Sequence, residues 1–432
     1  MRLTRRSFLA RASVAGLALL VPNARILLVL LVVAAAYGPA VQAAVGFAGS
    51  IIGIVTVLAT GFIIVTVRTC TPTLTPDGRP TDESSRLYGR QLSLSLLVGV
   101  LLLGIVGVIV LAAGVFSVGP LSGAYLAAAA LAVAFAPALF VLNAGFQTIH
   151  RDSGNLVVAC VGTAVHVSVA FIVGAVGVSD FAAVTLMGGI SSLTAVFGLV
   201  ARSWQLHRSG LLTVDAVRRG AADIARSPRS TSRILVEVAT ASLDGVVFMT
   251  VFATTIAVAL HSSVAAGAQM ALAVAVMRTI IIPMKQFGIV GARFTLRARA
   301  LPSQFAFRDV AIATEAVLVA SVAILVVSRS VLPPVQTLSW LLIALMAAQL
   351  LLEPFAGVAY AYRRIVDGPS AGLAALLIAY GGLYPVLILP LVAVGGAQAE
   401  ALWAALLASR ILFVILLTRS KAGRRLQPLP VR

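Results

Sequence analysis

Long apolar stretches separated by short polar gaps organise this sequence from end to end. A helix needs about 20 apolar residues to cross the hydrocarbon core of a bilayer, and each stretch is long enough to do so. The pattern therefore predicts an all-α polytopic membrane protein of about 12 transmembrane helices. The predicted spans are 12–36, 39–66, 89–114, 121–148, 154–177, 180–204, 231–257, 262–290, 303–328, 335–362, 369–393 and 397–419.

Basic residues gather in every second gap between these spans. Because Lys and Arg mark the cytoplasmic side of membrane proteins, this alternation predicts that both termini are cytoplasmic. The cytoplasmic gaps and the span ends beside them hold 27 of the 32 basic residues, one (Arg329) falls in an outer gap, and four lie deeper inside the spans, namely Arg25, Arg278, Lys285 and Arg410. The sequence thus predicts a multi-pass protein of the plasma (inner) membrane.

The first predicted span is the weakest, because Pro22, Asn23 and Arg25 interrupt it. Residues 4–9, which contain the pair Arg5-Arg6, resemble a twin-arginine export signal. Such a signal normally exports one folded domain, whereas eleven further spans follow here. We therefore expect these arginines to hold the N-terminus inside, with processing of the segment as the alternative.

Composition narrows the classes of partner and site. The chain is 60% hydrophobic and only 11% charged, which lies outside the range of soluble globular proteins. Its net charge of +18 is spread along one membrane face, so the expected partner is an anionic inner leaflet and not a nucleic acid. Two cysteines and four scattered histidines predict no disulfide framework, metal site or bound cofactor. No obligate protein partner is implied.

The longest polar gap near the middle divides the chain into two halves. Residues 205–230 show amphipathic spacing and predict a cytoplasmic linker or interfacial helix between lobes 1–204 and 231–432. Related segments recur at a nearly constant offset in the two halves, which suggests a duplicated six-helix unit, typical of transporters. Chance similarity among helices rich in Ala, Gly and Val is the alternative.

Several of these segments resemble the multidrug and toxic compound extrusion (MATE) family, whose superfamily includes lipid-linked oligosaccharide flippases. AAVGFAGS at 43–50 is similar to the start of the family's second helix. SSVAAGAQM at 262–270 is similar to its AAHQ segment, and Gln269 within it is a candidate for the cavity wall. The turns at 151–154 and 363–368 are similar to its RGxGDT motif. The resemblance implies two lobes around a central cavity, and export of organic compounds in exchange for H⁺ or Na⁺. The helix-one aspartate of some members has no counterpart here.

Two carboxylates inside predicted spans are candidates for cation coupling. Asp244 lies mid-way along the seventh span, and Glu353 lies deep in the tenth, before Pro354. Charges inside spans are costly and usually functional, and the MATE resemblance places cation-site carboxylates near both positions. Pro354 should bend the tenth span beside Glu353. In the alternative reading, both acids are structural and neutralised by neighbouring basic residues.

Polar side chains of other spans are candidates for the cavity wall. Arg278 and Lys285 share one face of the eighth span; Arg278 either pairs with a buried acid or joins Lys285 in a basic wall that receives anionic groups. Asn143 and Gln147 in the fourth span either bind substrate or bond across helices. His166 in the fifth span is either a hydrogen-bonded imidazole or a proton relay.

The sequence thus predicts a secondary active transporter that exports small organic compounds in exchange for H⁺ or Na⁺, by alternating access of two lobes. The alternative is a flippase for lipid-linked sugars, which a basic cavity would favour. A membrane-embedded enzyme is a weaker third reading, because the outer gaps are short. The chain also lacks a P-loop, a nucleophile elbow and an HExxH motif.

Overall fold

A computed structural model of the chain describes residues 5–75, 77–115, 119–149, 151–298, 307–331, 333–393 and 398–419. These residues form helices and no strand, as the apolar pattern predicts. The helices are α1 (Arg5–Tyr37), α2 (Pro39–Val57), α3 (Gly61–Cys70), η1 (Thr71–Thr73), α4 (Asp82–Val115), α5 (Pro120–Ala128), α6 (Ala130–Thr148), α7 (Asp152–Val176), α8 (Asp180–Arg208), α9 (Val214–Arg226), α10 (Pro228–Ser262), α11 (Val264–Ala298), α12 (Phe307–Val331), α13 (Pro333–Gln336), α14 (Trp340–Leu350), η2 (Pro354–Ala359), α15 (Tyr360–Val366), α16 (Leu373–Leu376), η3 (Leu377–Leu383), α17 (Tyr384–Ala393) and α18 (Ala399–Arg419).

The described helices account for eleven of the predicted spans. Ten are long and apolar enough to cross a membrane, and the pair Trp340–Leu350 and Pro354–Val366 makes an eleventh, bent by 43° at the break before Pro354. This bend confirms the kink predicted there. The predicted span 303–328 lies partly outside the described residues, and its described part contains the apolar helix Val317–Val327.

Helix α1 runs through the residues that seemed to interrupt it. Pro22 lies inside the helix, and the Asn23 side chain donates a hydrogen bond to the Leu19 carbonyl at 2.7 Å. The Thr279 hydroxyl of α11 donates to the Asn23 carbonyl at 3.1 Å. Neighbouring polar groups thus satisfy the backbone around the proline, which is how membrane helices tolerate this residue.

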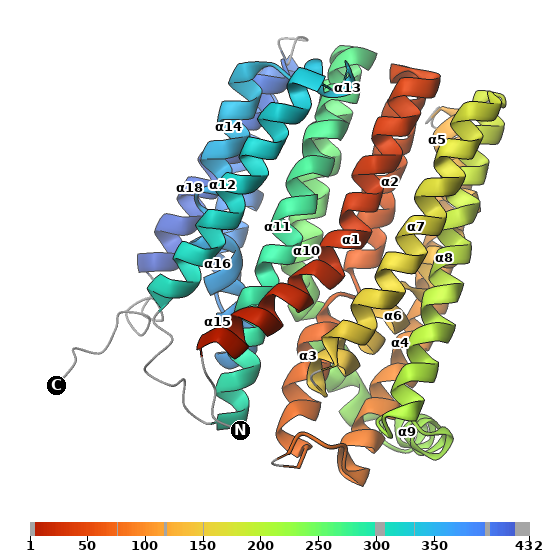
Figure 1. Cartoon of the computed structure of the whole chain (residues 1–432), viewed down its shortest axis with the longest axis vertical. Helices are drawn as coiled ribbons and strands as arrows, with labels where there is room; N and C mark the ends of the chain where they lie inside the picture. The colour runs from red at the N-terminus through yellow and green to blue at the C-terminus, as the bar shows by residue number, and fades with distance from the viewer. Residues whose placement is uncertain are drawn as a thin grey trace.

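The helices gather in two groups with a seam between them. In Figure 1, α4, α6, α7 and α8 lie on one side and α14, α16 and α18 on the other, with α1, α10 and α11 between them. One apolar core joins α10 and α11 to the helices from α12 to α18, and two further cores lie mainly in the first half but include Val238 of α10 and Ala275 of α11. The hydrophobic packing therefore also crosses the seam.

The segment between the halves is attached to the first of them. Helix α9 begins after Thr213, whose side chain caps the Ala216 amide, and it packs along the inner end of α4. Arg86 of α4 donates two hydrogen bonds to Asp223, at 2.7 and 2.8 Å. This bidentate contact lowers the pKa of the Asp223 carboxyl, because it stabilises the charged form.

The two halves approach closely where α2 and α3 meet α10 and α11. The Gly61 amide donates to the Ser242 hydroxyl at 2.9 Å, and a Cβ at Gly61 would overlap the Val238 carbonyl. At the C-terminal end of α6, Gln147 donates to Gln286 across the seam at 2.9 Å. Hydrogen bonds and small residues hold the two halves together here, as is usual between membrane helices.

A side chain at Gly61 should loosen this seam. We expect Gly61→Ala to lower stability by about 1–3 kcal/mol, because the added methyl group forces the backbones of α3 and α10 apart. Gly104→Ala is the matched control, since nothing lies near that position. Thermal unfolding in detergent measures both changes, and equal melting temperatures for the two variants would contradict the expectation.

Candidate functional site

Five charged side chains meet inside the second half of the protein. They come from five separate segments: Asp244 from α10, Lys285 from α11, Glu353 from the break before η2, Arg364 from α15 and Arg410 from α18. Glu353, Arg364 and Arg410 are almost completely buried, and Asp244 nearly so. We call these five residues the charge cluster.

Asp244 is paired with two cations. Its Oδ1 lies 2.5 Å from Nη1 of Arg364, and its Oδ2 lies 3.8 Å from Nζ of Lys285. Arg364 also donates hydrogen bonds to the backbone carbonyls of Thr240 and Ala241 beside Asp244. Asp244 therefore has a guanidinium partner whose position is fixed by further hydrogen bonds.

Glu353 is paired in the same way on the other side of the cluster. Its Oε1 accepts a hydrogen bond from Arg410, whose other terminal nitrogen donates to the Tyr380 hydroxyl at 3.3 Å. The bend of 43° lies directly before Pro354, and the π-helical turn of η2 follows it.

The structure thus brings together the two predicted coupling acids, and it gives each of them an arginine partner. Sequence reasoning missed both arginines. Arg364 was counted among the cytoplasmic residues after the tenth span, and Arg410 was noted only as a charge inside the twelfth. The position of Arg364 near the end of a span that Pro354 was expected to bend was the signal that could have indicated a buried arginine partner.

Arg278 does not join the charge cluster. It lines a cavity of about 180 Å³ between α1, α2, α7, α8 and α11, together with Arg25 and His166. Among the described residues, no carboxylate lines this cavity or pairs with Arg278, and Nε of Arg278 is buried without a hydrogen-bond partner. Arg278 was expected to pair with Asp244 or Glu353. Instead, Arg364 pairs with Asp244, and Arg410 pairs with Glu353.

The other two basic groups of this cavity were not predicted to lie beside Arg278. Nη1 of Arg25 donates to the Thr194 hydroxyl at 3.2 Å. His166 is 97% buried, and its Nδ1 has no hydrogen-bond partner. The three side chains lie near the middle of α1, α7 and α11, at the depth where transporters bind their substrates. We call this pocket the basic cavity.

The remaining predicted site residues lie elsewhere. Gln147 bonds to Gln286 across the seam, and its backbone carbonyl accepts from Arg293, which also lies 3.7 Å from Asp152. Gln269 donates to the Thr337 carbonyl at 2.9 Å, at the outer end of α11. Oδ1 of Asn143 is buried and unpartnered, but Asn143 does not line the basic cavity.

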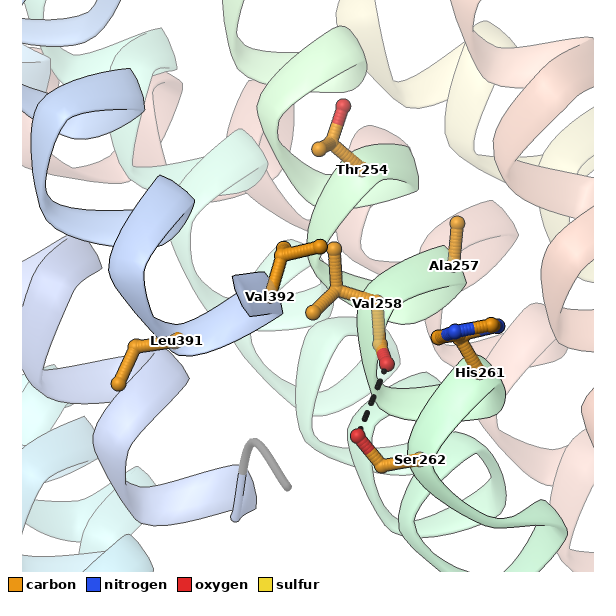
Figure 2. Close-up of a pocket in the computed structure, with 7 residues that line it drawn as sticks. All are labelled: Thr254, Ala257, Val258, His261, Ser262, Leu391 and Val392. Carbon is orange, nitrogen blue, oxygen red and sulfur yellow. Dashed lines mark hydrogen bonds between the residues drawn. The ribbon is translucent and has the colours of Figure 1, made fainter. Parts of the chain in front are cut away.

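A second, larger pocket lies at the outer end of α10. Its volume is about 290 Å³, and it lies between α10 and α17. Figure 2 shows that apolar side chains dominate it, with Ser262 donating to the Val258 carbonyl at 3.3 Å. Its polar groups are Thr254, His261 and Ser262, so it offers no charge pattern comparable to that of the basic cavity.

Comparison with solved structures gives the fold a precedent. A MATE protein in complex with Br-NRF aligns at a TM-score of 0.71 and 15% identity, over 97% of this chain and 95% of that one. An inward-facing multidrug resistance MATE family transporter of the MOP superfamily aligns at a TM-score of 0.69 and 16% identity, over 96% of this chain and 100% of that one. A MOP superfamily transporter from Pyrococcus furiosus aligns at 0.72 and 15% identity, over the full length of both chains. No family model and no curated protein matches the sequence.

This chain has the MATE transporter fold. The resemblance seen in short motifs is thus confirmed at the level of the whole architecture, over nearly the full length of the chain. Helix α1 of this fold carries Arg25 and no acid, and Arg25 lines the basic cavity.

The pair Glu353–Arg410 should contribute strongly to stability. Glu353→Gln leaves the Arg410 charge buried without its partner, and we expect a loss of about 3–5 kcal/mol. Removing both charges in Glu353→Gln/Arg410→Gln should recover part of that loss. Glu315→Gln, at an exposed position of α12, is the control. Equilibrium unfolding in mixed detergent tests the cycle, and a double variant less stable than the single one would contradict it.

Proposed function

We propose that this protein is a membrane transporter for an amphipathic anion, and specifically a flippase for phosphate-bearing lipid-linked sugars. One observation carries the proposal: the basic cavity contains Arg25, His166 and Arg278 and, among the described residues, no acid. Guanidinium groups bind phosphate through paired hydrogen bonds. A cavity with this lining attracts anions and repels cationic compounds.

The size of the basic cavity agrees with this substrate class. Its volume of about 180 Å³ is below the roughly 300–1,000 Å³ of pockets that enclose whole drug-sized ligands. The cavity is large enough for a charged head group but not for a complete glycolipid. The apolar tail of such a substrate would remain in the bilayer while the head group crosses, which is the task of a flippase.

Alternating access requires the seam to open at each end in turn. The outer contact is the Gln42 side chain, which donates to the Ala268 carbonyl at 3.5 Å, and the inner contacts are Gln147–Gln286 and Arg293–Asp152. All are polar contacts between the two halves, and opening the seam also separates apolar contacts such as those of Leu27 and Phe47 with the core of the second half. The basic cavity lies between the outer and inner contacts.

Export of small organic compounds, in exchange for H⁺ or Na⁺, is the second candidate function. The likeness to a MATE structure with a bound small molecule favours it. The charge of the basic cavity argues against cationic substrates for this chain. Another similar structure, the transporter from Pyrococcus furiosus, is described as having a binding pocket of reverse polarity, which suggests a different function for that protein.

Neutralising the basic cavity should distinguish these two functions. In proteoliposomes, we expect Arg278→Gln and Arg25→Gln each to slow translocation of a fluorescent polyprenyl diphosphate sugar about tenfold or more, equivalent to at least about 1.4 kcal/mol. Neither change should slow efflux of a cationic dye, if any occurs. Arg329→Gln is the control, because Arg329 stacks on Trp340 away from the cavity.

Two results would refute the flippase proposal. One is translocation of the diphosphate lipid by Arg278→Gln at the wild-type rate. The other is rapid dye efflux by the wild-type protein that Arg278→Gln accelerates, because removing a like charge should favour a cationic substrate.

A further inference from the structure

The charge cluster does not balance its own charge. It contains three cations, Lys285, Arg364 and Arg410, against two carboxylates, Asp244 and Glu353. If all five groups are ionised, the cluster carries one excess positive charge inside the membrane. Such an excess is costly in a low-dielectric interior, so one group has a reason to become neutral.

Four of the five groups form two close ion pairs. Arg364 and Arg410 are guanidinium groups, which do not lose their proton in proteins. Each lies against one carboxylate and also bonds to other polar groups, the carbonyls near Asp244 in one case and Tyr380 in the other. Each carboxylate therefore has an adjacent cation that stays charged.

Lys285 is held much less firmly. Its nearest anion is Asp244 at 3.8 Å, which is beyond hydrogen-bonding distance, and its ammonium group lies 5.0 Å from the centre of the Phe248 ring. Its side chain is 22% exposed, against 2% for both arginines. The amine is thus the accessible member of the cluster, and a buried lysine readily gives up its proton.

The composition of the chain makes this lysine unusual. Of the 32 basic residues, only Lys285 and Lys421 are lysines, and the other 30 are arginines. The single lysine within the predicted spans thus lies where the cluster has one positive charge too many. Arginine at this position would fix that excess charge permanently.

We propose that Lys285 is the proton-carrying group that couples transport to a proton gradient, in place of the predicted carboxylates Asp244 and Glu353. Its ammonium releases one proton to water and becomes a neutral amine, and no other bond forms or breaks. The neutral amine leaves the cluster with two cations and two anions. The groups that face it are Asp244, Glu353, Arg364 and Arg410, with the phenol of Tyr360 close to Asp244 and Arg364.

Helix α11 connects this proton site to the basic cavity. Lys285 lies seven residues after Arg278, about two turns or ~10 Å along the helix, with Pro283 between them. Gln286 and Arg293 of the same helix form the inner contacts with the first half. A change of charge at Lys285 therefore acts on the helix that carries both Arg278, which binds substrate in the proposed function, and the residues of the inner contacts with the first half. The inference rests on the proposed function for its substrate.

Two variants of Lys285 separate the proton site from the substrate site. Lys285→Arg keeps the positive charge but cannot release it, and Lys285→Met is permanently neutral. In proteoliposomes with an imposed pH gradient, we expect both to lose at least 90% of gradient-driven translocation of the polyprenyl diphosphate probe. Both should bind the probe with a Kd within about threefold of wild type. Arg278→Gln, by contrast, should raise the Kd for the probe.

Spectroscopy tests the protonation directly and needs no variant of Lys285. Protein labelled with ¹⁵N-lysine contains two labelled side chains, and Lys421→Arg leaves only Lys285. We expect its side-chain nitrogen signal to change from that of an ammonium to that of an amine at a pH where an exposed lysine is still charged. A signal that stays that of an ammonium up to pH 10 would overturn the proposal.

The remaining outcomes are also decisive. Gradient-driven translocation retained by Lys285→Met would overturn the proton role, as would wild-type transport that follows a chloride gradient and ignores pH. In the second case, a bound anion and not proton release balances the cluster. Failure of the wild-type protein to bind the probe would instead contradict the proposed function. The titration of Lys285 would still decide whether this lysine exchanges a proton.

Discussion

The cost of holding charge away from water shapes the interior of this protein. An ion moved into a low-dielectric environment loses several kcal/mol of hydration even after relaxation, which is comparable to the whole stability of a typical protein. In the second half, Asp244 and Glu353 meet this cost through direct contact with Arg364 and Arg410. In the basic cavity, Arg25 and Arg278 have no such counter-ion among the described residues. Space for water or an anionic guest takes its place.

This difference separates two kinds of buried charge. A buried ion pair is a structural element, because removing either member leaves the other as an uncompensated buried charge with its full desolvation penalty. Cations that face an open cavity lack such a partner, and under the proposed function an anionic ligand supplies it. Lys285 lies between these cases, since it has a distant partner and a chemically removable charge.

The sequence predicted the helices well and the lateral contacts poorly. Hydropathy measures how each segment transfers into lipid, so the spans and the bend at Pro354 could be predicted from local residues alone. Partners across helices depend on how each helix is rotated about its axis, and one sequence does not contain that rotation. The arginine partners of Asp244 and Glu353 were missed for this reason.

The candidate site shows the same division. Arg278 was correctly singled out as a charge inside a span, but its expected carboxylate partner is absent from its surroundings in the described residues. His166 and Arg25 were each read alone, because nothing in the spacing of α1, α7 and α11 along the chain shows that their middles meet. The short motifs at 151–154 and 363–368 pointed more directly to contacts between helices, since Asp152 and Arg364 within them both form buried ion pairs.

The attachment of α9 has a mechanical consequence. Since α9 is fastened to α4 by Arg86 and Asp223, the connecting segment is attached to the first half as far as Ser227, and α10 begins at Pro228. The first turn of α10 is attached as well, because Arg90 of α4 donates to the hydroxyl groups of Ser230 and Thr231 at 3.1 and 3.0 Å. Any motion of one half against the other therefore has to break these contacts or bend α10 beyond its first turn, so these hydrogen bonds add to the barrier for such a motion.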